Sequence, residues 1–314
     1  MSSNLSPSTW RTEQPNPSSV DLDTYTTQDI VETLLQADAS VALAVEAVSE
    51  SISQAADLMI ESIHGGGTVH YVGSGTSGRM GVLDAVELLP TFGVDSTTIQ
   101  AHLAGGEAAM MVAVEGAEDD EAAGAALVAS MSDKDVIVGL SASGRTPFVK
   151  GALKAGLTKG LKTVLIATNP TAALAPLATV KILPDTGPEV VTGSTRLKAA
   201  TAQKMILNTL STTTMVRLGK TFSNLMIDMI PTNEKLRNRA VRIVSEATGA
   251  SEEDARAALI QANGAIRLTI TSLIAGCDVA AAQQTLRDHP PSPNRVGDPS
   301  GIRTAITKLS GESP

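Results

Sequence analysis

The chain is poor in cysteine and in aromatic residues. Its 314 residues include one cysteine, Cys277, which excludes an intramolecular disulfide and any metal site built from several cysteines. We expect Cys277 to be a small buried apolar residue. Three Phe, two Tyr and one Trp leave little surface for stacking nucleic-acid bases or polysaccharide rings. A net charge of −9 also argues against a nucleic-acid-binding protein, because such surfaces are basic.

The histidines and the first residues of the chain lack the patterns of metal binding and of targeting. No two histidines stand at metal-ligand spacing, so we expect no metal ion, and we also expect no cofactor. Residues 1–16 are polar and have neither a basic start nor an apolar stretch, which predicts no signal peptide and a cytoplasmic location. Nothing in the sequence supports a membrane role. The four histidines are His64, His70, His102 and His289.

Apolar residues are abundant. They make up 42% of the chain against 18% charged residues, and the mean hydropathy is +0.10, as in a compact globular protein. The length favours one large domain with a smaller addition. The expected parts are an arm at 1–26, N-terminal helices at 27–54, the main domain at 55–230, a small helical domain at 231–288 and a loosely attached, flexible tail at 289–314.

Short apolar runs alternate with helical patterns in the main domain. Such alternation is typical of an α/β fold, a doubly wound parallel sheet with helices on both faces. The expected strands are 68–72, 97–103, 136–140, 163–167 and 180–183. The expected helices lie near 78–89, 107–131, 147–159 and 171–177, with a long helix after Gly193. Helical patterns also cover 27–35 and 39–63, and four shorter ones follow residue 231, near 235–247, 252–262, 264–275 and 278–287.

A glycine-rich loop, GSGTSGR at 73–79, follows the first of these strands and precedes a helix. Backbone amides, hydroxyls and the start of the helix can together surround an anion. The segment also matches the dinucleotide pattern G-x-G-x-x-G, but that reading requires an acidic residue about 20 positions later. The next strand ends in Gln100, Ala101 and His102, none of which is acidic. The sequence therefore argues against dinucleotide binding.

A second loop, SASGRTP at 141–147, follows the third strand and repeats the Ser-Gly-Arg triplet. Two hydroxyl-rich loops at the carboxyl ends of strands in one sheet favour a phosphomonoester over a pyrophosphate. The simpler alternative is a pair of ordinary strand-to-helix turns whose hydroxyls cap helices. Arg79 and Arg145 are open to either role, phosphate binding or structural capping.

The two loops resemble the phosphosugar-binding loops of the sugar isomerase domain family, over roughly residues 55–220. Their surroundings are similar to N-acetylmuramic acid 6-phosphate etherases from about residue 12 to about residue 285. The segments that carry this resemblance are DAVELLPTFG at 84–93, AGGE at 104–107, VEGAED at 114–119, EVVTGSTRLK at 189–198 and NLMID at 224–228. The resemblance implies a flavodoxin-like three-layer fold with a small C-terminal helical domain. A helix continuous from Ser77 to Glu87 would place the Glu87 carboxylate about 15 Å from the first loop, farther than a hexose phosphate spans. Either that helix ends early and the chain turns back, or Glu87 serves the pocket of a neighbouring subunit. We predict a homodimer whose active site lies at or near the subunit interface.

The resemblance further implies cleavage of the lactyl ether of N-acetylmuramic acid 6-phosphate. A base removes the C2 proton of the open-chain aldehyde, an acid protonates the departing lactate oxygen at C3, and water then adds to the product. Glu87 matches the family's proton donor, and Glu118 matches its second active-site glutamate. The remaining candidates are substrate-binding residues: Ser74, Gly75, Thr76, Ser77, Glu115, Ser141, Ser143, Gly144, Arg145, Thr146, Glu189, Ser194 and Lys198.

Each glutamate also has a non-catalytic explanation. Glu87 stands among Val86, Leu88 and Leu89, where we expect an unpaired charge to be unfavourable, so a functional role is preferred over a polar helix end. Glu118 belongs to an acidic run, which by itself is better explained as a solvated helix face.

Two other functions remain open at this point. One is a sugar-phosphate-binding regulator without catalysis, because the glucokinase regulatory protein is similar to these etherases. The other is an aldose-ketose isomerase, which binds the phosphate with the same kind of loops and also removes a C2 proton.

Overall fold

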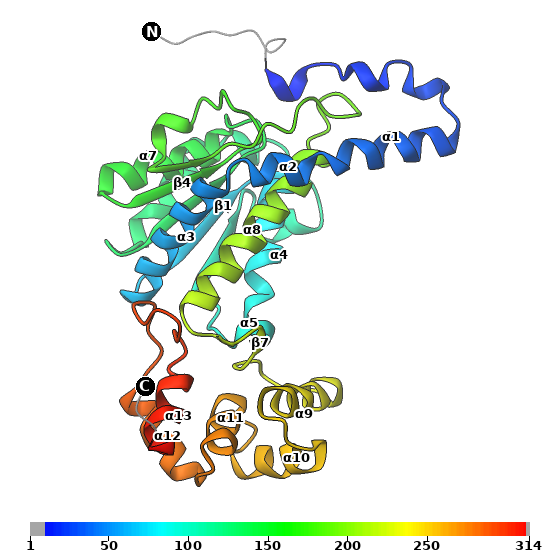
Figure 1. The fold of residues 1–314 in the computed structure, drawn as a ribbon. Coiled ribbons are helices and arrows are strands. Elements are labelled where there is room, and N and C mark those ends of the chain that lie inside the picture. Colours follow the sequence, from blue (N-terminus) through cyan, green and yellow to red (C-terminus); the bar gives the residue numbers. More distant parts are fainter. Residues whose placement is uncertain (1–9, 312–314) are drawn as a thin grey trace. The chain divides into compact units, whose positions relative to one another are not determined.

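The computed structural model describes residues 10–311 (Figure 1). The chain divides into two compact units. Of the described residues, the first unit comprises 10–86 and 97–211, and the second comprises 87–96 and 212–311.

The first unit is built on a five-stranded parallel sheet. Its strands are β1 (Val69–Gly73), β2 (Ile99–Leu103), β3 (Val136–Leu140), β4 (Lys162–Ile166) and β5 (Val180–Ile182). They lie in the order β2-β1-β3-β4-β5, and every pair is parallel. All residues of β1 and β3 are buried, which explains why these strands read as continuous apolar runs. The doubly wound α/β fold is confirmed, with strand ends shifted by a residue or two.

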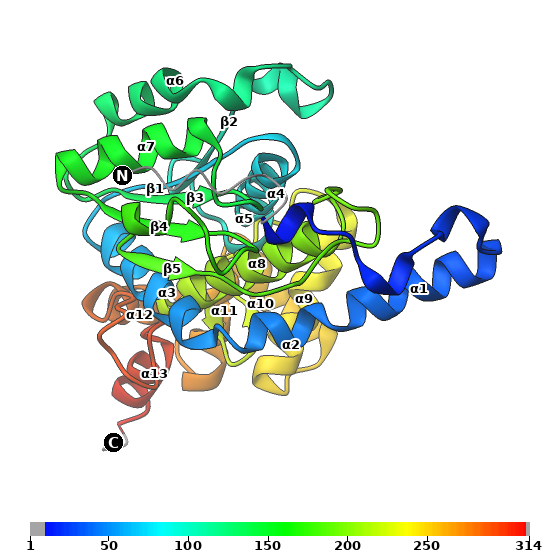
Figure 2. The same ribbon diagram turned by 90° about the horizontal axis from the view of Figure 1, so that it is seen from above.

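Helices cover both faces of this sheet (Figure 2). One face carries α6 (Glu121–Ala126) and α7 (Pro147–Lys159), and the other carries α3 (Ser49–His64) and α8 (Lys198–Arg217). On the α7 face, Ile137 and Leu165 of the sheet pack with Phe148 and Leu153 in one buried cluster. Burial of each such side chain contributes roughly 1.5–3 kcal/mol.

On the opposite face the polar centre is Asp84 of α4 (Gly75–Val86). Its carboxylate accepts hydrogen bonds from Tyr71 of β1 and from Asn208 and Ser211 of α8. Burial raises the pKa of the Asp84 carboxyl. These contacts tie α4 to the sheet and to α8.

Two expected helices of the first unit are wrong in extent. The segment 107–131 is broken into η5 (Glu107–Met110), η6 (Ala117–Asp119), α6 and η7 (Leu127–Ser130). Gly116 has a φ of 74°, a left-handed conformation that interrupts a helix. The segment 171–177 contains only the short turn η8 (Ala175–Leu177), since Pro176 cannot donate a helical hydrogen bond.

The N-terminal part consists of short helices. Three 3-10 turns, η2 (Arg11–Glu13), η3 (Pro17–Ser19) and η4 (Leu22–Thr24), precede α1 (Thr27–Ala39) and α2 (Val41–Glu46). The expected helix at 39–63 is therefore divided between α2 and α3. No residue of α1 is buried, and Val31 and Leu35 are exposed apolar side chains. The part of the expected arm at residues 1–9 lies outside the described residues.

The second unit is mainly helical. Its core contains Val244, Ala255, Ile270 and Ile302. Phe222 and Leu225 already pack against this core, ahead of the expected boundary at 230. The elements are α5 (Leu88–Phe92), β6 (Thr221–Phe222), β7 (Leu225–Met226), α9 (Glu234–Thr248), α10 (Glu252–Gln261), α11 (Ile266–Ala275), α12 (Val279–Asp288) and α13 (Ile302–Ser310). The strands β6 and β7 form an antiparallel hairpin.

Two expectations for this unit are wrong. The expected loose tail forms α13 instead, whose Ile302 and Ala305 are fully buried because they pack into the helical core. Asp298 accepts hydrogen bonds from the backbone amides of Arg303 and Thr304 at the start of this helix. Cys277 is partly exposed, because it lies just beyond the end of α11.

No single helix among the described residues is both long and apolar enough to cross a membrane. Only α10 and α11 taken together pass a test of length and composition, and they bend by 115° at their junction.

Candidate active site

The two predicted anion loops start side by side. Strand β1 ends at Gly73 and β3 ends at Leu140, and these two residues are partners in the parallel register. Adjacent strands lie about 4.8 Å apart, so Ser74 and Ser141 begin neighbouring loops at the carboxyl edge of the sheet. The chain leaves β1 toward β2 on one side, while β3 lies on the other. Ligands of α/β sheets bind at such a switch point.

The first loop runs directly into α4. A side chain at Gly78 would place its Cβ 2.5 Å from Leu103 and 2.7 Å from the Gly73 carbonyl. Glycine is therefore required for the first turn of α4 to pack on the end of β1. As a result, the amino terminus of α4 and its partial positive charge lie at the loop. No hydrogen bond within residues 10–311 occupies the hydroxyls of Ser74, Thr76 and Ser77.

A cavity of 310 Å³ opens beside the first loop. Glu115 and Glu118 line it together with Ser74 and Gly75 of the loop. Two stretches of the chain, 74–79 and 104–118, thus meet at one place, and both glutamates are exposed. The rest of the lining is Arg79, Ala104, Ala109, Ala113, Val114, Gly116 and Ala117.

Arg79 holds one wall of this cavity. Its Nε donates to the carbonyl oxygens of Ala109 and Met110, both at 3.1 Å, and a terminal nitrogen donates to Ala109 at 2.7 Å. Of the two roles left open for Arg79, the structure shows the structural one.

The second loop is shaped by Ser141. Its hydroxyl oxygen accepts hydrogen bonds from the backbone amides of Gly144 and Arg145, at 3.0 and 3.3 Å. It also lies 2.8 Å from the hydroxyl of Thr146. Because Ser141 is only 1% exposed, its hydroxyl serves the loop itself. Ser143 is partly exposed, and its hydroxyl has no hydrogen bond within the described residues.

Gly144 and Arg145 complete this loop. Gly144 has a φ of 68°, and a Cβ there would lie 2.3 Å from that of Ala172, so only glycine fits. Arg145 is partly buried beneath Trp10, whose ring centroid lies 4.4 Å from the guanidinium carbon. Sequence analysis missed Trp10. The available signal was a lone tryptophan in a polar segment of a chain with few aromatics.

Glu189 and Lys198 are buried and engaged within the first unit. The Glu189 carboxylate accepts hydrogen bonds from the amides of Lys198 and Ala199 at the start of α8, at 3.0 and 2.9 Å. The Lys198 ammonium donates to the Thr186 carbonyl at 2.6 Å. Burial raises the pKa of Glu189 and lowers that of Lys198. Ser194 lies partly exposed in the same loop. Substrate contacts of these three residues remain predictions.

The expected apolar surroundings of Glu87 are wrong in part, because only Leu88 among its apolar neighbours is buried. Glu87 is exposed, and so are its neighbours Val86 and Leu89. Helix α4 runs unbroken from Gly75 to Val86, which places its two ends about 16 Å apart. Glu87 follows the last residue of α4 and caps α5 without a side-chain hydrogen bond.

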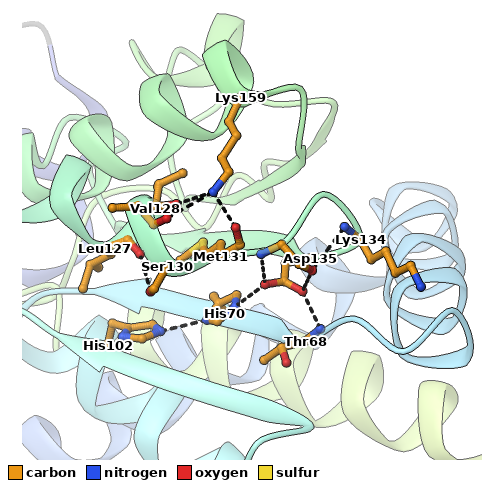
Figure 3. A network of polar contacts seen from close by, with 12 residues as sticks. Thr68, His70, His102, Leu127, Val128, Ser130, Met131, Lys134, Asp135 and Lys159 are labelled. Carbon is orange, nitrogen blue, oxygen red and sulfur yellow. Dashed lines mark hydrogen bonds and ion pairs between the residues drawn. The ribbon is translucent and has the colours of Figure 1, made fainter.

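A chain of polar contacts that the sequence did not predict joins β2, β1 and the residue that precedes β3 (Figure 3). Nδ1 of His70 lies 2.9 Å from Nε2 of His102, and Nε2 of His70 lies 3.2 Å from the Asp135 carboxylate. Asp135 also accepts hydrogen bonds from the amides of Thr68 and Ser132. Burial lowers the pKa of both histidines, that of His102 to about 4. Hydrogen bonds from Ser132 and Thr68 lower the pKa of Asp135 despite its burial.

Among residues 10–311, no three His, Cys, Asp or Glu side chains are placed to hold a metal ion.

The chain is similar to several known proteins. Residues 51–157 match the family model described as the glucokinase regulatory protein N-terminal SIS domain, and residues 223–264 match the C-terminal lid domain of that protein. The chain is similar to an N-acetylmuramic acid 6-phosphate etherase of Enterobacter sp. (strain 638), with 46% identity over 279 residues that cover 88% of this chain and 94% of the relative. The etherase of Symbiobacterium thermophilum is 49% identical over 259 residues, which cover 82% and 86% of the two chains. A solved phosphoheptose isomerase from Francisella tularensis is 19% identical, with a TM-score of 0.48 over 61% of this chain and 100% of that one.

Proposed function

Because the chain belongs to the N-acetylmuramic acid 6-phosphate etherase family, we propose that it cleaves the D-lactyl ether of N-acetylmuramic acid 6-phosphate. The products are N-acetylglucosamine 6-phosphate and D-lactate. The observation that carries this proposal is the cavity in which the first anion loop meets Glu115 and Glu118. It offers a place for a phosphate beside carboxylates that can move protons.

The phosphate is bound by the two neighbouring loops. In the first loop, Thr76 and Ser77 offer hydroxyls beside the amino terminus of α4, with Ser74 and Gly75 preceding them. In the second loop, Ser143 and Thr146 stand before α7. Hydrogen bonds from hydroxyls and amides to a charged phosphate are stronger than neutral ones, and helix amino termini favour the negative charge. Ser141, which we first expected to contact the phosphate, contributes by fixing the loop.

The reaction is an elimination followed by a hydration. In the open-chain aldehyde, the carbonyl at C1 acidifies the C2 proton, and a carboxylate removes it. The C3–oxygen bond then breaks, a double bond forms between C2 and C3, and an acid protonates the lactate oxygen as it leaves. Water adds across that double bond to restore the hydroxyl at C3. Glu118 is the proposed C2 base, and Glu87 is the proposed acid.

The protein acts as a homodimer in this proposal. The length of α4 supports it, because about 16 Å separate the first loop from the end of the helix that Glu87 follows. A hexose phosphate spans less than this distance. Glu87 therefore serves the pocket of a second copy, and the exposure of Glu87 and of the neighbouring Val86 agrees with a surface that a second subunit covers.

A cytoplasmic location also belongs to the proposal. The substrate carries a charged phosphate, and such a group does not cross a bilayer unaided.

Release of lactate tests the proposed function. Purified protein is incubated with N-acetylmuramic acid 6-phosphate, and D-lactate is measured with a D-lactate dehydrogenase. The wild type is expected to release one lactate per N-acetylglucosamine 6-phosphate formed, and Glu118→Gln is expected to release it at least roughly 100-fold more slowly. Unphosphorylated N-acetylmuramic acid serves as the control substrate.

Two other outcomes would overturn the proposal. Sugar-phosphate binding without lactate release would indicate a regulator, as the glucokinase regulatory protein matches suggest. Conversion of an aldose phosphate to a ketose phosphate without lactate release would indicate an isomerase.

A further inference from the structure

The only tryptophan of the chain stacks on an arginine of the second anion loop. Trp10 lies immediately before η2, and its ring centroid is 4.4 Å from the guanidinium carbon of Arg145. A guanidinium within about 6 Å of an indole face is attracted by the electrons of the ring. The indole therefore restricts the orientations that the Arg145 side chain can adopt.

Hydrogen bonds from other residues hold the segment that carries Trp10 to the loop at 185–190. We call residues 10–19 the strap. The guanidinium of Arg11 donates two hydrogen bonds to the Asp185 carboxylate, at 3.2 and 3.1 Å. Asn16 donates to the carbonyl of Pro188 at 3.1 Å, and Ser19 donates to that of Val190 at 2.7 Å. These anchors do not involve Trp10, so the strap keeps them when the indole is replaced.

One hydrogen-bond donor of the Arg145 guanidinium has no acceptor among the described residues, where the side chain lies beneath Trp10. Its Nε is buried and has no hydrogen-bond acceptor within residues 10–311, and the same holds for Nε1 of the stacked indole. Buried donors in folded proteins are nearly always paired. An anionic oxygen is the acceptor that suits a guanidinium best, and phosphate oxygens match its geometry. The second anion loop is where the proposed function places a phosphate.

We propose that Trp10 is a positioning residue, whose ring holds the Arg145 guanidinium toward the phosphate of the bound sugar phosphate. This inference rests on the proposed function and adds to it a role for the N-terminal strap, which becomes part of the phosphate site. Trp10 acts through Arg145 and touches no reacting atom.

Steady-state kinetics of Trp10 variants test the proposal. Trp10→Leu keeps an apolar side chain but removes the ring face, and it is expected to raise KM about tenfold while kcat stays within about twofold. A tenfold change corresponds to ~1.4 kcal/mol, within the range of a partly desolvated cation–π contact. Trp10→Phe retains a ring face and is expected to keep KM within about threefold of the wild type. Val20→Ala, an exposed change just beyond the strap, is the matched control. An unchanged KM in Trp10→Leu would overturn the proposal.

A double-mutant cycle separates positioning from a general structural effect. If Trp10 acts through Arg145, then Trp10→Leu has no further effect on KM when Arg145→Gln is already present. Two independent effects would instead multiply, and a tenfold rise of KM in the Arg145→Gln background would refute the coupling.

The fluorescence of Trp10 gives a second measurement that does not depend on ether cleavage. Because the chain has one tryptophan, its emission reports on this contact alone. Titration of the wild type with inorganic phosphate is expected to change the emission saturably, and sodium chloride at equal ionic strength is expected not to. Arg145→Gln is expected to abolish the response. A flat titration of the wild type would contradict the proposal.

Different results would refute the proposed ether cleavage and the proposed role of Trp10. If the wild type released no lactate while the emission responded to phosphate through Arg145, the proposed function would fall and the role of Trp10 would stand. If lactate were released while the emission and the KM of Trp10→Leu did not change, only the role of Trp10 would fall.

Discussion

Lowering the pH from 7 to 4 is expected to destabilise the first unit through His102. In the folded protein, burial and the neighbouring His70 lower the pKa of His102 to about 4 from an ordinary value of 6.5. The unfolded chain therefore binds a proton on His102 at a higher pH than the folded protein does. The stabilisation is complete above pH 6.5 and is lost as the pH falls from 6.5 toward 4.

The size of the effect follows from this shift. Each pKa unit corresponds to about 1.4 kcal/mol, and integration between pH 7 and pH 4 gives about 3 kcal/mol for His102. His70 acts in the same direction, since burial lowers its pKa as well, although its contact with Asp135 opposes the shift. The low pKa of the Asp135 carboxyl stabilises the folded protein above the ordinary value of 3.8. This stabilisation is lost mainly below pH 3.8, outside this pH window.

The free energy of unfolding is measured by urea denaturation at a series of pH values between 4 and 7, with circular dichroism as the signal. His102→Asn is expected to reduce the loss of unfolding free energy across this range by about 3 kcal/mol relative to the wild type. The matched control is His64→Asn, a change of an exposed histidine at the end of α3. The reasoning would be refuted if His102→Asn and the wild type lost equal stability between pH 7 and pH 4.

Three further predictions concern the proposed reaction. Ser77→Ala and Ser143→Ala are each expected to raise KM roughly 10- to 100-fold, because a lost hydrogen bond to a charged phosphate costs about 1.5–3 kcal/mol; unchanged KM and kcat in both variants would contradict this. Glu118→Gln is expected to suppress both deuterium exchange at C2 and lactate release, whereas Glu87→Gln is expected to stop lactate release while exchange persists; the opposite pattern would mean that the two roles are reversed. Light scattering is expected to show a dimer, and subunit exchange between inactive Glu87→Gln and Glu118→Gln is expected to restore roughly a quarter of the wild-type activity, because half of the dimers then carry one intact shared site. A fully active monomer would exclude the shared site.

The sheet and its loops could be predicted from local patterns. Strands buried on both faces are continuous apolar runs, so β1 and β3 were recognisable, and the residues after them could be assigned to one edge of a parallel sheet. Helix α7 was also found with its correct bounds, because Pro147 opens it and Gly160 closes it. Helix ends and breaks were harder to predict where several glycines lie close together in the sequence, as between β2 and α6.

The errors concern residues whose environment is made by distant parts of the chain. Glu87 stands among apolar neighbours in sequence, yet it is exposed, because burial depends on what packs against a turn and not on the adjacent residues. The capping of α8 by the Glu189 carboxylate, across nine residues of the chain, was also not predicted. The tail was expected to be loose because of its prolines, and α13 nevertheless packs into the helical core.

The sequence by itself determined the α/β class, the positions of the two glycine- and serine-rich loops and the family, since apolar periodicity, glycine spacing and local motifs are properties of short segments. Only the tertiary structure decided which side chains meet: Glu118 with the first loop, His70 with His102 and Asp135, and Trp10 with Arg145. The last pair joins residues 135 positions apart. No local pattern encodes such contacts, because they depend on how strands are ordered in the sheet and on where the strap is anchored.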